Sequence, residues 1–230
     1  MRFSRLISCC ISFSLILSAA PAPAASAVRS AEPDWGAVAG GYPAPGSPAA
    51  REELATLHRL QDQRTPADVD RILRESHPDL GLFLDAIGGS DPSDYPATQA
   101  LLKQAKRDLK PVVAALKDRF RRIRPFQADP TLHPALDPDG SFSFPSKHAA
   151  LGTLFADLLI RLDPADAEAL AGEGRLIAAD RVLAGLHWPS DVRAGQHLGE
   201  AFARDWLARP DLAWMVQDAA AEWAGPSRKR

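Results

Sequence analysis

Cysteine is almost absent from this sequence. The 230 residues contain two, Cys9 and Cys10, and both lie within the first ten positions. The rest of the chain can therefore form neither a disulfide framework nor a thiolate metal site. A long apolar run is also missing: after residue 27, no segment approaches the roughly 20 apolar residues that a membrane-spanning helix needs. We therefore expect a soluble product without stable membrane insertion.

The sequence has no excess of positive charge. Lys and Arg number 27 against 29 Asp and Glu, which gives a formal net charge of −2. Proteins that bind nucleic acid usually carry a basic surface that neutralises phosphates. The charge balance therefore predicts that nucleic acid is not a partner.

The first 27 residues have the organisation of a signal peptide. Arginines at positions 2 and 5 precede an apolar run over 6–20, and alanines follow at 25 and 27. The run is too short to span a membrane, so we predict cleavage near Ala27 and a periplasmic or secreted product. Cleavage would remove both cysteines, two arginines and no acidic residue, which takes the formal net charge from −2 to −4.

The alternating apolar and polar pattern of β-strands is missing too, and the signals for element boundaries are those of helices. Residues 28–48 are rich in Ala, Gly and Pro and are expected to form an irregular arm. After this arm, cap residues precede prolines at positions 48, 66 and 164, as at helix starts. The sequence predicts an all-α fold with one compact domain over 49–230 and the site at helix ends. Six or seven helices are expected, from the segments 48–63, 66–76, 97–122, 146–161, 164–184, 189–208 and 211–223.

Residues 126–143 interrupt the helices. They carry three prolines and a glycine between two helical segments, which indicates a surface loop. We expect this loop to border a substrate pocket.

The first candidate site segment is Lys117-DRFRRI-Arg124-Pro125. At 3.6 residues per turn, Lys117 and Arg124 share one helix face, and Pro125 places Arg124 where the helix ends. Two such cations can clamp a phosphate, arginine as a bidentate fork and lysine as a point charge. Because three further arginines lie between them, at 119, 121 and 122, the segment alone also fits a solvated basic face.

The second segment, Pro145-Ser146-Lys147-His148, opens a predicted helix. Apolar residues follow His148 at helical spacing, so His148 faces the core side. The amides of Ser146 and Lys147 fall at the helix N-terminus, where free N–H groups and the helix dipole favour an anion. A histidine beside that anion can protonate a leaving group. Alone, the segment also fits a capped helix start with a structural histidine.

The third segment is Arg181-VLAGL-His187-WPS-Asp191. Arg181 shares a helix face with apolar residues, so it points inward and needs an anionic partner there. The proline two residues after His187 starts the next helix and puts Asp191 in its first turn. The Asp191 carboxylate can then hold one ring nitrogen of His187 and leave the other free to attack. Alone, the pair also fits a structural His–Asp cap.

Together, the three segments resemble the class A non-specific acid phosphatases of the phosphatidic-acid phosphatase type 2 superfamily. The superfamily signature reads Lys-x6-Arg-Pro, Pro-Ser-Gly-His and Ser-Arg-x5-His-x3-Asp, and the flanking strings IRPF and HWPSDV are similar as well. Nine specified residues in this order make a chance match on the order of one in a million. The resemblance extends over residues 97–208.

The resemblance implies an acid phosphatase that hydrolyses small phosphomonoesters without a metal or another cofactor, and it suggests a homodimer. By this resemblance His187 is the nucleophile that becomes phosphohistidine, Asp191 holds its tautomer, and His148 is the general acid and then the base. The residues implied in binding the phosphoryl oxygens are Lys117, Arg124, Ser146, Lys147 and Arg181.

Two positions depart from the signature. Lys147 replaces glycine, which matters if the backbone there needs a positive φ; on a helical backbone the lysine would add a fourth cation at the pocket rim. Asp180 replaces serine beside Arg181. Adjacent helix positions do not face each other, so Asp180 is expected to point away, whereas an inward Asp180 would repel phosphate.

Three other functions remain open at this stage. A lipid or isoprenoid-diphosphate phosphatase would share the site, and aromatic residues at 126, 142, 144 and 188 motivate it. A vanadate-dependent haloperoxidase uses the same constellation, although those enzymes look much larger. A degenerate anion-binding protein would explain Lys147 and Asp180. The other four histidines, at 58, 77, 133 and 197, have no partner pattern and are expected at the surface or in packing.

Overall fold

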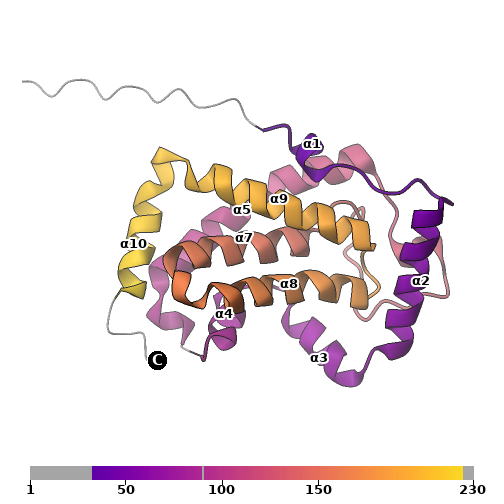
Figure 1. Cartoon of the computed structure of the whole chain (residues 1–230), viewed down its shortest axis with the longest axis horizontal. Coiled ribbons are helices and arrows are strands. Elements are labelled where there is room, and N and C mark those ends of the chain that lie inside the picture. The colour runs from indigo at the N-terminus through magenta and orange to yellow at the C-terminus, as the bar shows by residue number, and fades with distance from the viewer. Residues whose placement is uncertain (1–32, 90, 225–230) are drawn as a thin grey trace, which may run out of the picture. The chain divides into compact units, whose positions relative to one another are not determined.

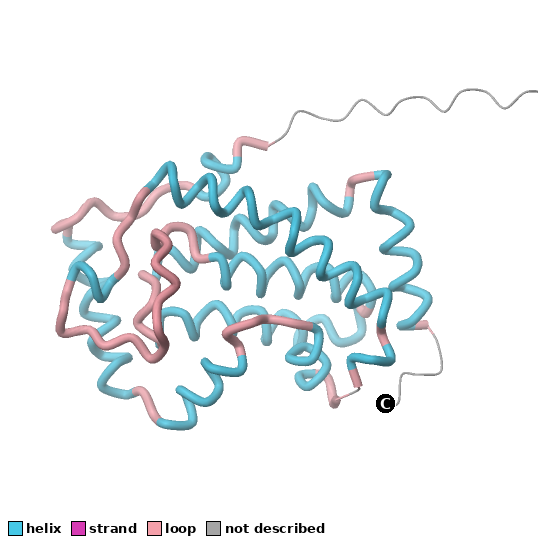
Figure 2. Tube along the Cα trace, turned by 180° about the vertical axis from the view of Figure 1, so that it is seen from behind, coloured by secondary structure: helices cyan, strands magenta, loops and turns pink. Residues whose placement is uncertain are grey.

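A computed structural model describes residues 33–89 and 91–224 of the chain (Figures 1 and 2). The signal peptide predicted over 1–27 lies outside the described residues, and so do the first residues of the predicted arm. All regular elements within the described ranges are helices, which confirms the all-α prediction. In these ranges no helix combines the length and the apolar character that crossing a lipid bilayer requires.

The described residues form more α-helices than the six or seven predicted. In chain order they are α1 (Trp35–Ala39), α2 (Pro48–Gln63), α3 (Pro66–Arg74), α4 (Leu80–Ala86), α5 (Pro96–Phe120), α6 (Pro125–Ala128), α7 (Lys147–Leu162), α8 (Ala167–Leu183), α9 (Pro189–Leu207) and α10 (Ala213–Trp223). Short 3₁₀ turns at Pro92–Asp94, Pro164–Asp166 and Pro210–Leu212 precede α5, α8 and α10.

The additional helices are the short ones, α1, α4 and α6. Each has seven residues or fewer, too few for a 3.6-residue period to repeat in the sequence. Their starts are nevertheless capped: Asp34 accepts from the Gly36 amide at 3.0 Å, and Asp79 accepts from the Gly81 amide at 2.9 Å. Helix α1 lies inside the segment that we expected to be irregular.

Helix α7 is the centre of the fold. It lies between α8 and α9 (Figure 1), and α5 and α10 also contact it. Its apolar residues are buried on several sides, as expected of a helix that is covered all round. The buried apolar side chains of α7 include Leu151, Leu154, Phe155, Leu158 and Leu159.

Glycines let α9 approach α7 closely. A Cβ atom on Gly195 or Gly199 would fall far inside van der Waals contact with the carbonyl oxygen of Ser146 or Ala150. The two helices therefore meet backbone to backbone at the start of α7. This contact fixes the N-terminal turn of α7, with Lys147 and His148, beside the N-terminal turn of α9, with Asp191.

The end of α5 turns two arginines inward. Arg121 has a left-handed backbone (φ 49°), and its amide donates to the Lys117 carbonyl oxygen at 2.9 Å. The chain beyond is extended, so Arg122 and Arg124 face one side and Ile123 faces solvent. Arg122 and Arg124 are thereby buried. The helix predicted over 97–122 included Arg122, but α5 ends at Phe120.

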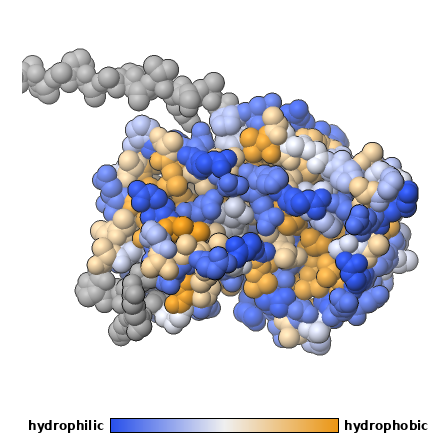
Figure 3. Space-filling model, in the orientation of Figure 1, coloured by the Kyte–Doolittle hydropathy of each residue, from blue (hydrophilic) through white to orange (hydrophobic). Residues whose placement is uncertain are grey.

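The exterior includes a largely polar face. The face in Figure 3 carries hydrophilic side chains interspersed with smaller apolar patches. The long loop between α6 and α7, residues 129–146 (part of the pink trace in Figure 2), connects the first candidate segment to the second.

Candidate active site

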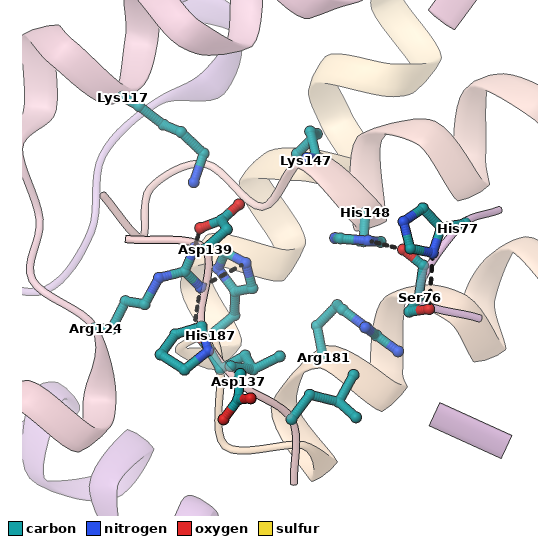
Figure 4. A pocket seen from close by; sticks show the side chains of 13 residues that line it. Ser76, His77, Lys117, Arg124, Asp137, Asp139, Lys147, His148, Arg181 and His187 are labelled. Atoms are coloured by element: carbon teal, nitrogen blue, oxygen red, sulfur yellow. Dashed lines mark hydrogen bonds and ion pairs between the residues drawn. The ribbon is translucent and has the colours of Figure 1, made fainter. Parts of the chain in front are cut away.

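A pocket of about 240 Å³ gathers most of the predicted site residues (Figure 4). Its walls come from the α3–α4 connection, the end of α5, the α6–α7 loop, the start of α7, and the end of α8 with the turn that follows it. Six predicted residues line it: Lys117, Arg124, Lys147, His148, Arg181 and His187. Predicted residues separated by up to 70 positions in the sequence therefore meet at one cavity, which the α6–α7 loop borders as expected.

Asp191 lies behind His187 and not in the pocket wall. Its Oδ2 atom is 3.4 Å from His187 Nδ1 and accepts from the Trp188 amide at 2.9 Å and from the Ser143 hydroxyl. Burial would raise the pKa of Asp191, but His187, Arg122 and Ser143 lower it overall. Asp191 is thus a carboxylate that can hold Nδ1–H of His187 and leave Nε2 as the unprotonated nitrogen.

His187 is a buried, neutral imidazole. Burial lowers its pKa to about 4, although the hydrogen bond and the charge of Asp191 act in the opposite direction. Its Nε2 atom lies 3.4 Å from Arg124 Nη1, on the pocket side. A neutral ring whose unprotonated Nε2 faces the pocket beside cations is suited to attack an electrophilic phosphorus.

Arg122 orients Asp191, a role that the sequence did not indicate. Its Nη1 donates to Asp191 Oδ1 at 2.7 Å, and its Nη2 donates to Glu53 Oε2 at 2.9 Å. The guanidinium lies 4.4 Å from the Tyr42 ring centroid and 4.9 Å from that of Trp188. Arg122 is therefore not part of a solvated basic face. Arg122 lies two residues before Arg124, so an extended chain would have placed both side chains on one side, but the helix predicted over 97–122 hid this signal. Nothing in the sequence pointed to Glu53.

Lys117 and Arg124 are held by the loop between α6 and α7. Lys117 Nζ donates to the Phe142 carbonyl oxygen and, at 3.2 Å, to the Ser141 hydroxyl. Burial, with the nearby charge of Arg124, lowers the pKa of Lys117 to about 8. Arg124 also contacts this loop, through Ser141 and through an ion pair of 2.7 Å with Asp139. Both cations are fixed in place before any ligand arrives.

His148 faces the α3–α4 connection. Its Nε2 atom lies 2.9 Å from the carbonyl oxygen of Ser76, which can only accept, so Nε2 carries a proton and Nδ1 is left as the basic nitrogen. Burial, with the charge of Arg181, lowers the pKa of His148 to about 3. Figure 4 shows the ring turned toward Ser76, whose hydroxyl is 3.0 Å from His77 Nδ1.

Arg181 has the inward position that the third segment predicts. It is 1% exposed, and its Nη2 lies 3.6 Å from Glu75 Oε2 and 3.4 Å from the Ile72 carbonyl oxygen. Its Nε has no hydrogen-bond partner among the described residues. Burial, with the charge of Asp180, raises the pKa of Glu75. A protonated Glu75 leaves the charge of Arg181 largely available to a ligand.

The two departures from the motif are accommodated. Asp180 points away from the pocket and accepts from Arg71 Nε at 2.7 Å and Nη2 at 3.0 Å. Lys147 is the first residue of α7, has no positive φ, and lines the pocket. The pocket therefore holds a fourth cation at its rim, and Asp180 does not face the anion site.

Ser146 differs from the other predicted phosphate ligands. Its amide donates to the Asp191 carbonyl oxygen at 2.9 Å, and its hydroxyl oxygen accepts from the Ala149 amide at 3.3 Å. Ser146 is fully buried and is absent from the described pocket wall. It links the starts of α7 and α9, and its amide is already engaged.

Other pocket residues had no sequence signal. His77, expected at the surface or in packing, is exposed and lines the pocket, as do four residues of the α6–α7 loop, Leu136, Asp137, Pro138 and Asp139. Conversely, the described wall of the pocket includes none of the aromatic residues at 126, 142, 144 and 188. Phe144 and Trp188 are buried in packing instead. Among the residues that the structure describes, no group of three or more His, Cys, Asp or Glu is placed to hold a metal ion.

Comparison with known proteins finds similarity over the part of the chain that contains the three segments. Residues 109–214 match the model of the PAP2 superfamily. The chain is 35% identical over 132 residues to a non-specific acid phosphatase of Salmonella typhi, which covers 54% of this chain and 52% of that protein. It is 31% identical over 109 residues to an acid phosphatase of Zymomonas mobilis, covering 46% and 41%. The chain thus spans about half the length, or less, of these curated relatives.

A solved structure has a similar fold. It is described as the first transmembrane PAP2 type phosphatidylglycerolphosphate phosphatase from Bacillus subtilis. The similarity has a TM-score of 0.50 at 21% sequence identity, and it covers 69% of this chain and 85% of that chain. At this identity the likeness concerns the arrangement of helices.

Proposed function

Because residues 109–214 match the model of the PAP2 superfamily, we propose that this protein is a phosphatase that hydrolyses small phosphomonoesters through a phosphohistidine on His187. The observation that carries the proposal is the convergence of His148, His187 and four cations on one pocket. The relatives named acid phosphatase support the reaction type. The leader-like pattern over 1–27 supports export, which we include in the proposal.

In the first step, Nε2 of His187 attacks the phosphorus atom. The N–P bond forms as the bond from phosphorus to the leaving oxygen breaks, and Asp191 stabilises the proton on Nδ1 of the ring as positive charge develops. His148, protonated in the substrate complex, gives its proton to the leaving oxygen. The products of this step are an alcohol and phosphohistidine.

In the second step, His148 is the base. Having lost its proton, it accepts one from a water molecule, and the oxygen of that water attacks phosphorus. The N–P bond breaks, inorganic phosphate leaves, and neutral His187 is regenerated. A pKa of about 4 keeps His187 unprotonated, and therefore nucleophilic, in mildly acidic solution.

Fixed cations supply the electrostatic stabilisation. Lys117, Arg124 and Arg181 surround the position between the two histidines, where the phosphoryl oxygens would lie (Figure 4). Their buried charges need no reorganisation as negative charge shifts in the transition state, and loss of one such group should cost about 10²–10³ in rate. Because these side chains stabilise the phosphoryl oxygens, we propose that the reaction needs no metal ion.

The size of the pocket favours a small substrate. Its volume of about 240 Å³ is below the roughly 300–1,000 Å³ typical of sites for drug-sized ligands. The aromatic residues that motivated a lipid substrate do not contribute to its described wall. Short phosphomonoesters therefore fit the proposal better than long-chain ones.

The test is hydrolysis of an aryl phosphate, between acid and neutral pH, with a chelator present. We expect turnover by the native protein and its loss in His187→Ala, because the proposal assigns the nucleophile to His187 Nε2. The control is His197→Ala, since His197 is exposed on α9 and lies outside the pocket. Undiminished turnover by His187→Ala, or loss of turnover with chelator alone, would contradict the proposal.

A further inference from the structure

Every N–H donor of Arg124 is already directed at an acceptor. A guanidinium group has five N–H donors. Nε donates to the Ser141 carbonyl oxygen at 2.9 Å; Nη1 donates to the Leu186 carbonyl oxygen at 2.9 Å and points at His187 Nε2 at 3.4 Å. Nη2 donates to Asp139 Oδ1 at 2.7 Å and to the Ser141 hydroxyl at 3.1 Å. A phosphate must therefore replace existing partners of Arg124.

Only one of these partners is charged and free to move. The Asp139 side chain is 52% exposed, whereas that of Arg124 is 5% exposed. Asp139 can turn into water at the pocket mouth, but Arg124 is fixed by two carbonyl oxygens. The Arg124 N–H directed at His187 Nε2 can turn to phosphate, because in the reaction Nε2 faces phosphorus instead. This N–H alone gives phosphate one hydrogen bond. The paired N–H groups that make arginine a bidentate fork become available only when Asp139 leaves.

Asp139 is also prepared as an anion. It accepts from the Ser141 amide at 3.1 Å and from the Ser141 hydroxyl at 2.8 Å, an arrangement typical of an Asx turn. Partial burial would raise its pKa, but these hydrogen bonds and the charges of Arg124 and Lys117 take the pKa well below the usual range for aspartate. Asp139 therefore presents a full negative charge to Arg124 throughout the pH range of acid and neutral assays.

We propose that Asp139 is a resident anionic ligand of Arg124, which competes with phosphate for the guanidinium and lowers the affinity of the site for substrate and product phosphate alike. The inference rests on the proposed function, since it assigns Arg124 to phosphate. Substrate binding displaces the carboxylate, and its return helps to expel inorganic phosphate after the second step. The α6–α7 loop thus holds Lys117 and Arg124 in place through Ser141, and through Asp139 it also competes with phosphate for Arg124.

Asp137 provides the matched control. It lines the same pocket two residues earlier in the same loop. Among the described residues it makes no recorded ion pair, and Arg124 pairs with Asp139 alone. Asp137→Asn and Asp139→Asn remove the same charge from the same pocket wall, and each asparagine keeps an oxygen that can accept. Only the second change weakens a ligand of Arg124.

The experiment is calorimetric titration of the purified protein with inorganic phosphate. We expect Asp139→Asn to bind roughly tenfold more tightly than the native protein, since one charge-assisted hydrogen bond no longer opposes binding. Asp137→Asn should stay within about twofold. In steady-state assays, KM and the inhibition constant for phosphate should fall together in Asp139→Asn.

Three results would overturn the inference. Weaker phosphate binding by Asp139→Asn would mean that Asp139 positions Arg124 for phosphate, and equal binding would mean that the two do not compete. An equal gain in phosphate affinity from Asp137→Asn would mean that removal of any negative charge from the pocket wall strengthens binding, without competition for Arg124. Failure of every variant to bind phosphate, with the protein folded, would remove the proposed function as well, which distinguishes the two failures.

Discussion

At the scale of single residues, burial decides the protonation of the two histidines that we propose as catalytic. Both are neutral near pH 7, with a pKa of about 3 for His148 and about 4 for His187. Neutrality suits His187 as a nucleophile, but His148 must hold an extra proton to act as an acid. A bound phosphate dianion would supply the missing attraction, because a nearby negative charge favours the protonated imidazole.

We therefore predict that phosphate binding raises the pKa of His148 above its value of about 3 in the free protein. Between the free and the bound pKa, binding takes up a proton, so affinity increases as the pH falls through that window and levels off below about 3. The histidine ring signals, followed by NMR against pH with and without inorganic phosphate, measure both values. His197, exposed outside the pocket, should show no response.

An unchanged His148 pKa in the phosphate complex would contradict this assignment. The acid would then have to be another group, and His77, which lines the pocket beside Ser76, would be the first to test.

At the scale of elements, the site depends on how closely α7 and α9 approach. His148 belongs to the first turn of α7, and Asp191 to the first turn of α9. Gly199 packs its Cα against the backbone of Ala150, one turn beyond the contact of Gly195 with Ser146. A side chain at Gly199 would push the two helices apart and tilt both catalytic turns.

We predict that Gly199→Ala destabilises the protein by about 1–3 kcal/mol, the usual cost of overpacking. Gly172→Ala is the matched control, because Gly172 lies within α8 and a Cβ there would meet nothing closer than Arg175 Nη2 at 3.8 Å. That change should stabilise by roughly 0.5–1 kcal/mol through helix propensity. Urea denaturation of the two variants measures the difference. Similar stability for both would show that the α7–α9 spacing is not set by Gly199.

The helix boundaries show which parts of the fold could be predicted from the sequence. Helices α2 and α3 begin where predicted, because a cap residue and a proline at the first position specify the start locally. Helix α8 begins later than predicted, since the proline at 164 opens a 3₁₀ turn instead. Helix α4 was missed, because seven residues repeat the apolar period at most twice. Local signals are therefore sufficient for long capped helices only.

At the scale of the whole molecule, the site is an assembly of distant segments. Residue type and spacing selected Lys117, His148 and His187 as candidates, and all three line the pocket. The partners of these residues could not be found in that way. Glu53 is linked to Asp191 through Arg122, which is 69 residues away from Glu53 in the sequence. Such contacts exist only once α2, α5 and α9 have packed.

Asp139 illustrates the same limit. Its sequence context, a Pro-Asp-Gly turn, predicts a surface loop and says nothing about Arg124. The ion pair between them follows from the path of the whole α6–α7 loop across the end of α5.

The measurement that tests the account most directly is detection of the phosphoryl group on His187 during turnover. A reaction with an aryl phosphate is quenched within the first turnovers, and the His187 peptide is examined by mass spectrometry under conditions that preserve phosphohistidine. The account predicts one added phosphoryl group at His187, in the presence of chelator, and none in His187→Ala. Hydrolysis that proceeds at the native rate with no phosphoryl group on His187 would contradict it.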